Sequence, residues 1–208
     1  MNIRLKKQEQ VKVMNTSDLY TIMQRILLRE NKIDRNREHF WTVSLDTACK
    51  ILNIELISLG SVNKVLVEPM EVFSVPLQKR AVSVVLVHNH PSGELVPSVA
   101  DKDITDRLIQ CGQILNVSIS DHLIITEKTY YSSMESGLLQ KLRQSKKYVP
   151  EYKLKELLTK EMEASIRKDE NEQKAKAMAK VMKQNGEAVE KIMQYTGLSK
   201  TVIQRIKI

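Results

Sequence analysis

The spacing of hydrophobic residues predicts a helix near the start of the chain. The apolar side chains there recur at intervals of three and four residues: Leu19, Ile22, Met23, Ile26, Leu27 and Leu28. That period places them on one face of an α-helix. Residues 15–18 are types that cap a helix N-terminus, and the charged segment 30–38 ends the pattern. Residues 1–11 are mostly polar, and we expect them to be flexible.

The hydrophobic period then changes to that of β-strands. Alternation of apolar and polar residues, together with runs of β-branched residues, predicts five strands. They lie at residues 40–46, 51–59, 81–87, 117–126 and 130–133. The first two strands are joined closely enough, through residues 47–50, to form a hairpin. The third is nearly continuous in valine and leucine, which is typical of a strand buried on both faces.

Two helices are predicted between these strands. Pro69 suits the first turn of a helix over residues 69–80, whereas Pro76 should kink that helix or end it early. Ser98 can cap another helix that runs to about Cys111. Strands that alternate with helices after an initial hairpin indicate the α/β class, with a mixed sheet flanked by helices.

The composition shifts in the last third of the chain. Residues 151–183 are rich in strong helix formers and poor in β-branched residues. Residues 168–174 have no apolar side chain and are either a hinge or an exposed helix. A turn at residues 196–199 separates two further amphipathic segments, a spacing that suits a helix-turn-helix. We therefore expect an α/β domain, a helical linker and a small helical module, at residues 12–137, 138–173 and 174–208.

Composition and charge narrow the function classes. The chain has 208 residues, with 33 Lys and Arg against 25 Asp and Glu, a net charge of +8 that permits nucleic-acid binding without establishing it. No run of 18 apolar residues occurs, so we expect no membrane span. The polar start lacks the apolar core of a signal peptide, which indicates the cytoplasm. Cys49 and Cys111 are too few for a disulfide framework, and their apolar neighbours indicate buried free thiols.

The most informative segment follows the third predicted strand. His88 and His90 are two residues apart, so on an extended backbone both imidazoles point to one side. Asp101 lies about one turn into the next helix and can reach the same point. Two imidazole nitrogens and one carboxylate oxygen give Zn²⁺ three protein ligands and leave one position for water, as in catalytic zinc sites. The alternatives are two polar loop histidines and an acid that only stabilises the helix N-terminus.

The same residues resemble a known family. His88-Asn89-His90-Pro91-Ser92-Gly93, followed by Ser98 and Asp101, is similar to the JAMM signature of JAB/MPN metalloproteases, and most similar to the RadC-like branch. Further similar segments lie, in order, at residues 38–40, 45–46, 60–63, 69, 71–73 and 121–122, and the resemblance covers about residues 12–137. It implies a JAB/MPN-type mixed sheet with cytidine-deaminase-like layering. It also implies a zinc-dependent hydrolase that cleaves peptide or isopeptide bonds, with a protein or peptide as substrate.

The resemblance assigns roles beyond the metal ligands. Glu38 corresponds to the glutamate that activates the water as general base and then acid. Its alternative is a solvated acid paired with Arg35 or Arg37. Glu55 is the fallback for this role, although strand alternation favours an outward-facing side chain there. Ser98 corresponds to the serine whose hydroxyl stabilises the oxyanion, and helix capping is a competing role for the same hydroxyl.

Less specific candidates complete the set. Asp121 and His122 are expected behind the metal ligands or at the edge of the substrate. Four positions depart from the family pattern in ways that would alter the substrate groove, namely Glu68, Met70, Pro76 and Leu95.

A second function class rests on the charge and on the last two helical segments. The protein would be a DNA-associated accessory factor of DNA repair or of a mobile element, with the JAB domain as a scaffold. Lys200, Gln204 and Arg205 would then contact nucleic acid. A small oligomerisation or docking module explains the same residues equally well.

Overall fold

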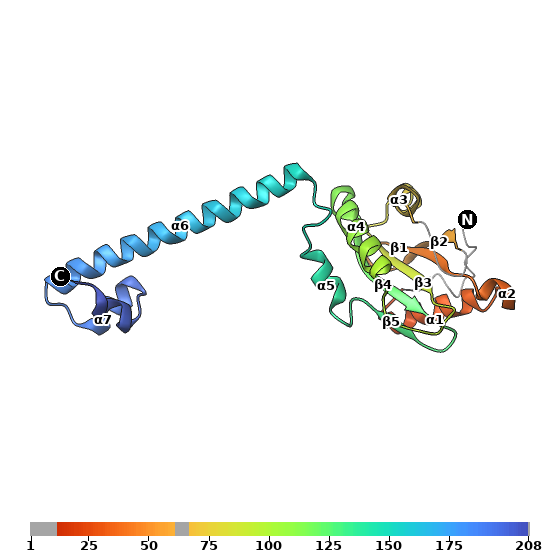
Figure 1. Cartoon of the computed structure of the whole chain (residues 1–208), viewed down its shortest axis with the longest axis horizontal. Helices are drawn as coiled ribbons and strands as arrows, with labels where there is room; N and C mark the ends of the chain where they lie inside the picture. The colour runs from red at the N-terminus through yellow and green to blue at the C-terminus, as the bar shows by residue number, and fades with distance from the viewer. Residues whose placement is uncertain (1–11, 61–66, 208) are drawn as a thin grey trace. The chain divides into compact units, whose positions relative to one another are not determined.

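The computed structural model describes residues 12–60 and 67–207 (Figure 1). The expected flexible segment 1–11, and most of the family-like segment 60–63, lie outside the described residues. The chain divides into two compact units between Val149 and Pro150. Each unit is described by itself.

The first unit is built on a five-stranded mixed sheet of order β2-β1-β3-β4-β5. Its strands are β1 (His39–Leu45), β2 (Ile51–Leu59), β3 (Ser83–Asn89), β4 (Ser118–Ile125) and β5 (Tyr130–Ser132). Only β3 and β4 pair in parallel, and the other neighbours are antiparallel. The five predicted strands are therefore confirmed, as is the predicted hairpin of β1 and β2.

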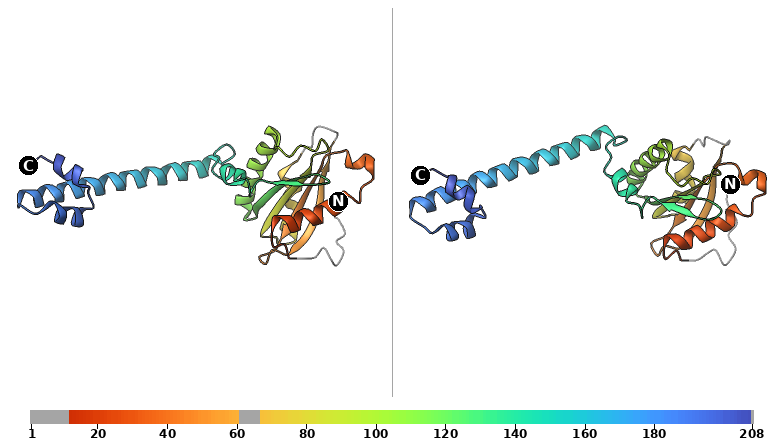
Figure 2. Two further views of the ribbon diagram at one scale, coloured as in Figure 1. Left: turned by 90° about the horizontal axis from the view of Figure 1, so that it is seen from below. Right: turned by 60° about the horizontal axis from the view of Figure 1, so that its bottom comes forward.

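Helices cover both faces of the sheet (Figure 2). Helix α1 (Thr16–Leu27) packs on one face, where Met23 and Trp41 are fully buried. The other face carries three helices, α3 (Pro69–Gln78), α4 (Val99–Leu115) and α5 (Leu138–Arg143). A one-turn helix, α2 (Lys32–Arg35), lies in the charged segment and was not predicted. This three-layer arrangement confirms the expected α/β fold.

Several local predictions need correction. Cys49 lies exposed in the β1–β2 turn with a positive φ of 59°, and Cys111 is half-buried, so neither is a fully buried thiol. Helix α3 continues through Pro76 and ends two residues later at Gln78. Pro76 costs the helix one backbone hydrogen bond, the one that an N–H at this position would donate to the Val72 carbonyl, and the helix ends within the next turn.

The crossover from β3 through α4 to β4 positions the candidate site. Because β3 and β4 are parallel, α4 must start near the carboxyl end of β3 and run back along the sheet. The residues after β3 and the first turn of α4 therefore meet at one edge of the sheet, where open α/β sheets commonly place their sites.

The first compact unit extends to Val149, beyond the domain end expected at residue 137. Leu139 of α5 is buried in the same core as Phe73 and Leu108. Beyond α5, the Ser145 hydroxyl donates a hydrogen bond to the Asp106 carboxylate at 2.6 Å. Tertiary packing therefore ties residues 138–149 to the sheet, although their composition resembles that of the helices that follow.

The second unit is entirely helical. Helix α6 (Glu151–Gln184) is continuous over 34 residues, so residues 168–174 form an exposed helix and the hinge alternative is wrong. Helices α7 (Val189–Thr196) and α8 (Lys200–Arg205) follow. Ala179, Ile192 and Ile203 form a small core that joins the end of α6 to both. Within the described residues, none of the helices has both the length and the apolar character needed to cross a membrane.

Candidate metal centre

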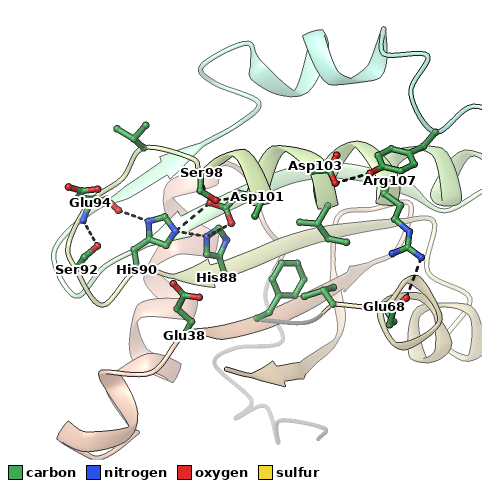
Figure 3. Close-up of a pocket in the computed structure, with 16 residues that line it drawn as sticks. Glu38, Glu68, His88, His90, Ser92, Glu94, Ser98, Asp101, Asp103 and Arg107 are labelled. Carbon is green, nitrogen blue, oxygen red and sulfur yellow. Dashed lines mark hydrogen bonds and ion pairs between the residues drawn. The ribbon is translucent and has the colours of Figure 1, made fainter. Parts of the chain in front are cut away.

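Two histidines and an aspartate converge at the carboxyl end of β3 (Figure 3). The Nε2 atoms of His88 and His90 are 2.8 Å apart. One carboxylate oxygen of Asp101 lies 3.3 Å from Nε2 of His88, and the other lies 3.6 Å from Nε2 of His90. The three side chains therefore direct one ligand atom each towards a common point.

A capping box places Asp101 at this point. The Ser98 hydroxyl accepts a hydrogen bond from the Asp101 N–H at 3.0 Å. The Asp101 carboxylate in turn accepts from the Ser98 N–H at 2.7 Å. This reciprocal pair satisfies two backbone donors at the start of α4. It also holds the carboxylate beside the two histidines.

Hydrogen bonds fix the tautomer of His90. Its Nδ1 lies 2.7 Å from the carbonyl oxygen of Glu94. A carbonyl only accepts, so Nδ1 carries the proton and donates. The lone pair of neutral His90 is therefore on Nε2, the atom that faces His88.

A longer chain of hydrogen bonds fixes His88 in the same way. Nδ1 of His88 lies 2.8 Å from Nε2 of His122, and Nδ1 of His122 lies 2.6 Å from the Thr105 hydroxyl. The Thr105 hydroxyl donates to the carbonyl oxygen of Asp101 and must therefore accept from His122. Donation then runs in one direction, from His88 to His122 to Thr105. Neutral His88 consequently has its lone pair on Nε2 as well.

This arrangement fits a metal ion. Two nitrogen lone pairs that face each other at 2.8 Å repel unless a cation lies between them. A tetrahedral zinc site with bonds of about 2.0–2.1 Å has ligand atoms about 3.3 Å apart, close to the separations in this cluster. Imidazole and carboxylate are also the ligand types that zinc takes in sites that keep an open position. The group formed by His88, His90 and Asp101 can hold a metal ion.

The surroundings favour neutral His88 and ionised Asp101, the protonation states in which each side chain can bind a metal ion. Burial lowers the pKa of His88 well below its usual value, so the imidazole stays neutral. Burial also lowers the pKa of His122, to about 4. For Asp101, burial raises the pKa, but contacts with His90, His88 and Ser98 outweigh it and hold the pKa well below its usual range. The contact with Asp101 raises the pKa of His90.

Glu38 lines the same cavity, just before β1. Its carboxylate points towards the imidazoles of His88 and His90 (Figure 3). Burial raises its pKa, while nearby His90 lowers it and Asp101 raises it. The alternative of an ion pair with a neighbouring arginine is wrong, because Arg35 pairs with Glu127 and Arg37 is nearest to Asp34.

Asn89 holds the segment that carries Glu38. Its side-chain oxygen accepts from the His39 N–H at 2.7 Å, and its amide nitrogen donates to the Arg37 carbonyl at 3.0 Å. The residues on either side of Glu38 are therefore both hydrogen-bonded to the residue between the two histidines. Asn89 is buried and belongs to the motif, but its role was not predicted.

The remaining candidates lie elsewhere. Glu55 is on β2 opposite Thr42 and does not line the cavity. His122 lies directly behind His88, as expected for a residue that supports a ligand. Asp121 points to the other face of β4, where it accepts hydrogen bonds from Ser132 and from the Met134 N–H. Successive strand residues face opposite ways, so Asp121 does not join the site.

The metal cluster opens into a cavity of about 640 Å³. Apolar side chains from β1, the segment before α3, the loop before α4 and α4 itself line it, namely Phe40, Val67, Val96 and Ile104. Farther along, Arg107 pairs with Glu68 at 3.3 Å, and the Tyr148 hydroxyl donates to Asp103 at 2.7 Å. Of the four positions that depart from the family pattern, only Glu68 lines this cavity.

The fold and the site together define an α/β protein with a candidate metal centre. The model of the RadC-like JAB domain matches residues 13–138 of the chain. The match covers more than half of the sequence and includes every residue of the cluster. The chain belongs to the RadC-like JAB domain family.

Curated relatives carry the name UPF0758 protein. One from Flavobacterium johnsoniae is 40% identical over 127 residues, which are 61% of this chain and 53% of the relative. One from Moorella thermoacetica is 44% identical over 104 residues, 50% of this chain and 45% of the relative. One from Methanosarcina barkeri is 39% identical over 129 residues, 62% of this chain and 54% of the relative. The chain thus spans about half the length of these relatives.

Proposed function

We propose that the first unit is a zinc-dependent hydrolase of the JAMM type that cleaves peptide or isopeptide bonds. The observation that carries the proposal is the convergence of His88, His90 and Asp101, with both imidazole lone pairs directed at one point. His88, His90 and Asp101 would hold the zinc ion, which would lower the pKa of a water molecule towards about 7 and polarise a substrate carbonyl. The proposal concerns this unit alone.

Glu38 is the proton carrier in this reaction. Its carboxylate faces the metal ligands across the cavity, within the same pocket and not bonded to them. A pKa raised by burial makes this carboxylate a better base than an exposed glutamate. Glu38 takes the proton from the attacking water and then gives it to the departing amine.

Ser98 can stabilise the oxyanion without giving up its role as a helix cap. A hydroxyl has one hydrogen to donate and two lone pairs. The cap uses a lone pair, since the Ser98 oxygen accepts from the Asp101 N–H. The O–H remains available to donate to a developing oxyanion in the cavity. The expected competition between the two roles therefore does not arise.

The cavity supports a peptide segment as the substrate. It is open along one side and large enough for several residues of an extended chain, and both apolar and charged side chains line it. The apolar stretch around Phe40 and Ile104 can accept a hydrophobic side chain next to the cleaved bond, and Arg107 can pair with an acidic group farther along.

The first test is the metal content of the purified chain. We expect about one zinc per wild-type chain by elemental analysis and none in the double variant His88→Ala/His90→Ala. Absence of zinc from the wild type, with none taken up from added Zn²⁺, would overturn the proposal.

The second test is hydrolysis. A mixture of denatured proteins and ubiquitin-like conjugates serves as substrate, and cleavage sites are read by mass spectrometry. We expect Glu38→Gln to keep its zinc and lose cleavage, because it keeps the shape of the side chain but not the base. Glu55→Gln, a matched change outside the cavity, should keep both. Zinc-loaded wild type that cleaves no more than Glu38→Gln would contradict the assignment.

A further inference from the structure

The second unit ends in a helix-turn-helix. Helix α7 ends at Thr196, residues 197–199 form the turn, and α8 begins at Lys200. Gly197 has a positive φ of 67°, a conformation that glycine adopts without strain, and its N–H closes α7 on the Met193 carbonyl at 2.9 Å. A short turn with a glycine at this position is typical of helix-turn-helix units.

The small core fixes which face of α8 is free. Ile203 is fully buried against Ala179 of α6 and Ile192 of α7. Four polar residues of α8 are exposed to solvent: Lys200, Thr201, Gln204 and Arg205. Arginine and lysine pair with guanine edges, glutamine with adenine, and threonine with the thymine methyl group. The free face of the second helix therefore carries the side chains that a DNA-reading helix uses.

The net positive charge is concentrated in the same part of the chain. Residues 174–208, named here the C-terminal module, contain eight Lys and Arg against two Glu, so six of the eight net positive charges of the chain lie there. Lys191 pairs with Glu187 and Lys176 with Glu172. Lys200, Arg205 and Lys207 are exposed and form no ion pair within the described residues.

One lysine has a structural role instead. Lys183 donates from its ammonium group to the carbonyl oxygens at the end of α8, with the shortest contact, 2.8 Å, to Ile206. This contact fixes the carboxyl end of α8 against α6. It also offsets the negative end of the helix dipole.

We propose that the C-terminal module binds duplex DNA, with α8 in the major groove and the flanking lysines on the phosphates. Three features point to DNA in particular: a helix-turn-helix, a polar free face on its second helix, and a net positive charge concentrated in the C-terminal module. A protein partner docked on α8 would need an exposed apolar face there, but Ile203 is buried and the exposed large apolar side chains of the module, such as Met193 and Tyr195, lie outside α8.

The test is fluorescence anisotropy of a labelled duplex of about 20 base pairs, two helical turns, titrated with the full chain. We expect a dissociation constant in the micromolar range at about 50 mM salt, weakening steeply towards about 200 mM because counterions are released from the phosphates. The triple variant Lys200→Gln/Arg205→Gln/Lys207→Gln should bind about tenfold more weakly or worse, with a salt slope reduced by about three.

A matched variant controls for overall charge. Lys79→Gln/Lys102→Gln/Lys141→Gln removes three exposed lysines from the first unit and changes the net charge equally. It should bind DNA as the wild type does, and so should His88→Ala/His90→Ala, which separates this proposal from the hydrolase. The changed side chains are all exposed, so folding is preserved and far-ultraviolet circular dichroism verifies it. No binding at about 50 mM salt, or equal loss in both triple variants, would overturn the proposal.

Discussion

At the scale of single residues, His122 determines how firmly the first metal ligand is held. Its Nε2 accepts a hydrogen bond from Nδ1 of His88, and its own Nδ1 donates one to the Thr105 hydroxyl, in a buried chain. Replacing it with phenylalanine keeps a ring but removes the acceptor. We expect His122→Phe to lower zinc affinity by about 10–100-fold, the usual cost of losing the partner of a metal-bound histidine. Competition with a chromophoric chelator measures it.

Ile124→Val is the matched control for that variant. Ile124 is buried on the same strand and face as His122 but makes no contact with the cluster through hydrogen bonds. The Ile124→Val substitution should lower the free energy of unfolding by about 0.5–1.5 kcal/mol and leave zinc affinity unchanged. Equal zinc affinity in wild type and His122→Phe would show that the tautomer of His88 does not depend on His122.

Asn89 supports a different prediction, because it acts on the segment of Glu38 and not on the metal. In Asn89→Ala the buried His39 N–H loses its acceptor. An unpaired buried donor costs about 1–3 kcal/mol, so the free energy of unfolding in urea should fall by that amount. Zinc affinity should stay within about twofold of the wild type, since neither imidazole bonds to Asn89. A large loss of zinc with unchanged stability would contradict this account.

The sequence predicted the three residues of the cluster and His122 behind them, but not the other supports. His88, His90 and Asp101 come from one short segment, so their convergence follows from local geometry and from the resemblance to a known motif. Thr105 and the role of Asn89 depend on which strand lies beside β3 and on how α4 packs, and neither is encoded locally. Asp121 was misassigned because it neighbours His122 in sequence, whereas strand alternation turns the two apart.

At the scale of elements, the start of α4 couples folding to the site. The capping box at Ser98 both begins the helix and orients the carboxylate of Asp101. We expect Ser98→Ala to lower stability by about 1 kcal/mol through loss of the cap and to weaken zinc binding as Asp101 gains freedom. Ser98→Asp, which retains a cap acceptor, should restore most of the stability. Thermal unfolding and the chelator assay together measure both effects, and a stability loss without any change in zinc binding would show that the cap does not position Asp101.

Strands and helices with a clear hydrophobic period were predictable, and the boundaries decided by tertiary packing were not. The hairpin and the buried β3 follow from alternation and β-branched runs. Residues 138–149 resemble the helical tail in composition, yet Leu139 is buried against the sheet. Residues 168–174 allowed two interpretations, because a polar segment forms either a hinge or a solvated helix, and only the backbone distinguishes them.

At the scale of the whole molecule, the two units have separate hydrophobic cores, and within the described residues the candidate metal site lies in the first. The cores of the first unit surround the sheet on both faces. Within residues 150–207, the core of the second has three buried apolar side chains, Ala179, Ile192 and Ile203. Buried apolar area sets most of the free energy of folding, so the second unit should be the less stable of the two.

Metal binding should therefore stabilise one unit and not the other. A ligand at about 100 times its dissociation constant stabilises the state that binds it by about 2.7 kcal/mol. Removing zinc with a chelator should lower the unfolding temperature of the first unit by several degrees and leave the second unchanged. Hydrogen exchange read by mass spectrometry assigns each transition to its residues. Ile203→Ala is the reciprocal change: it should open α7 and α8 to exchange while zinc content stays at the wild-type level. If chelation loosened both units equally, their folding would be coupled and the independence of their cores would be refuted.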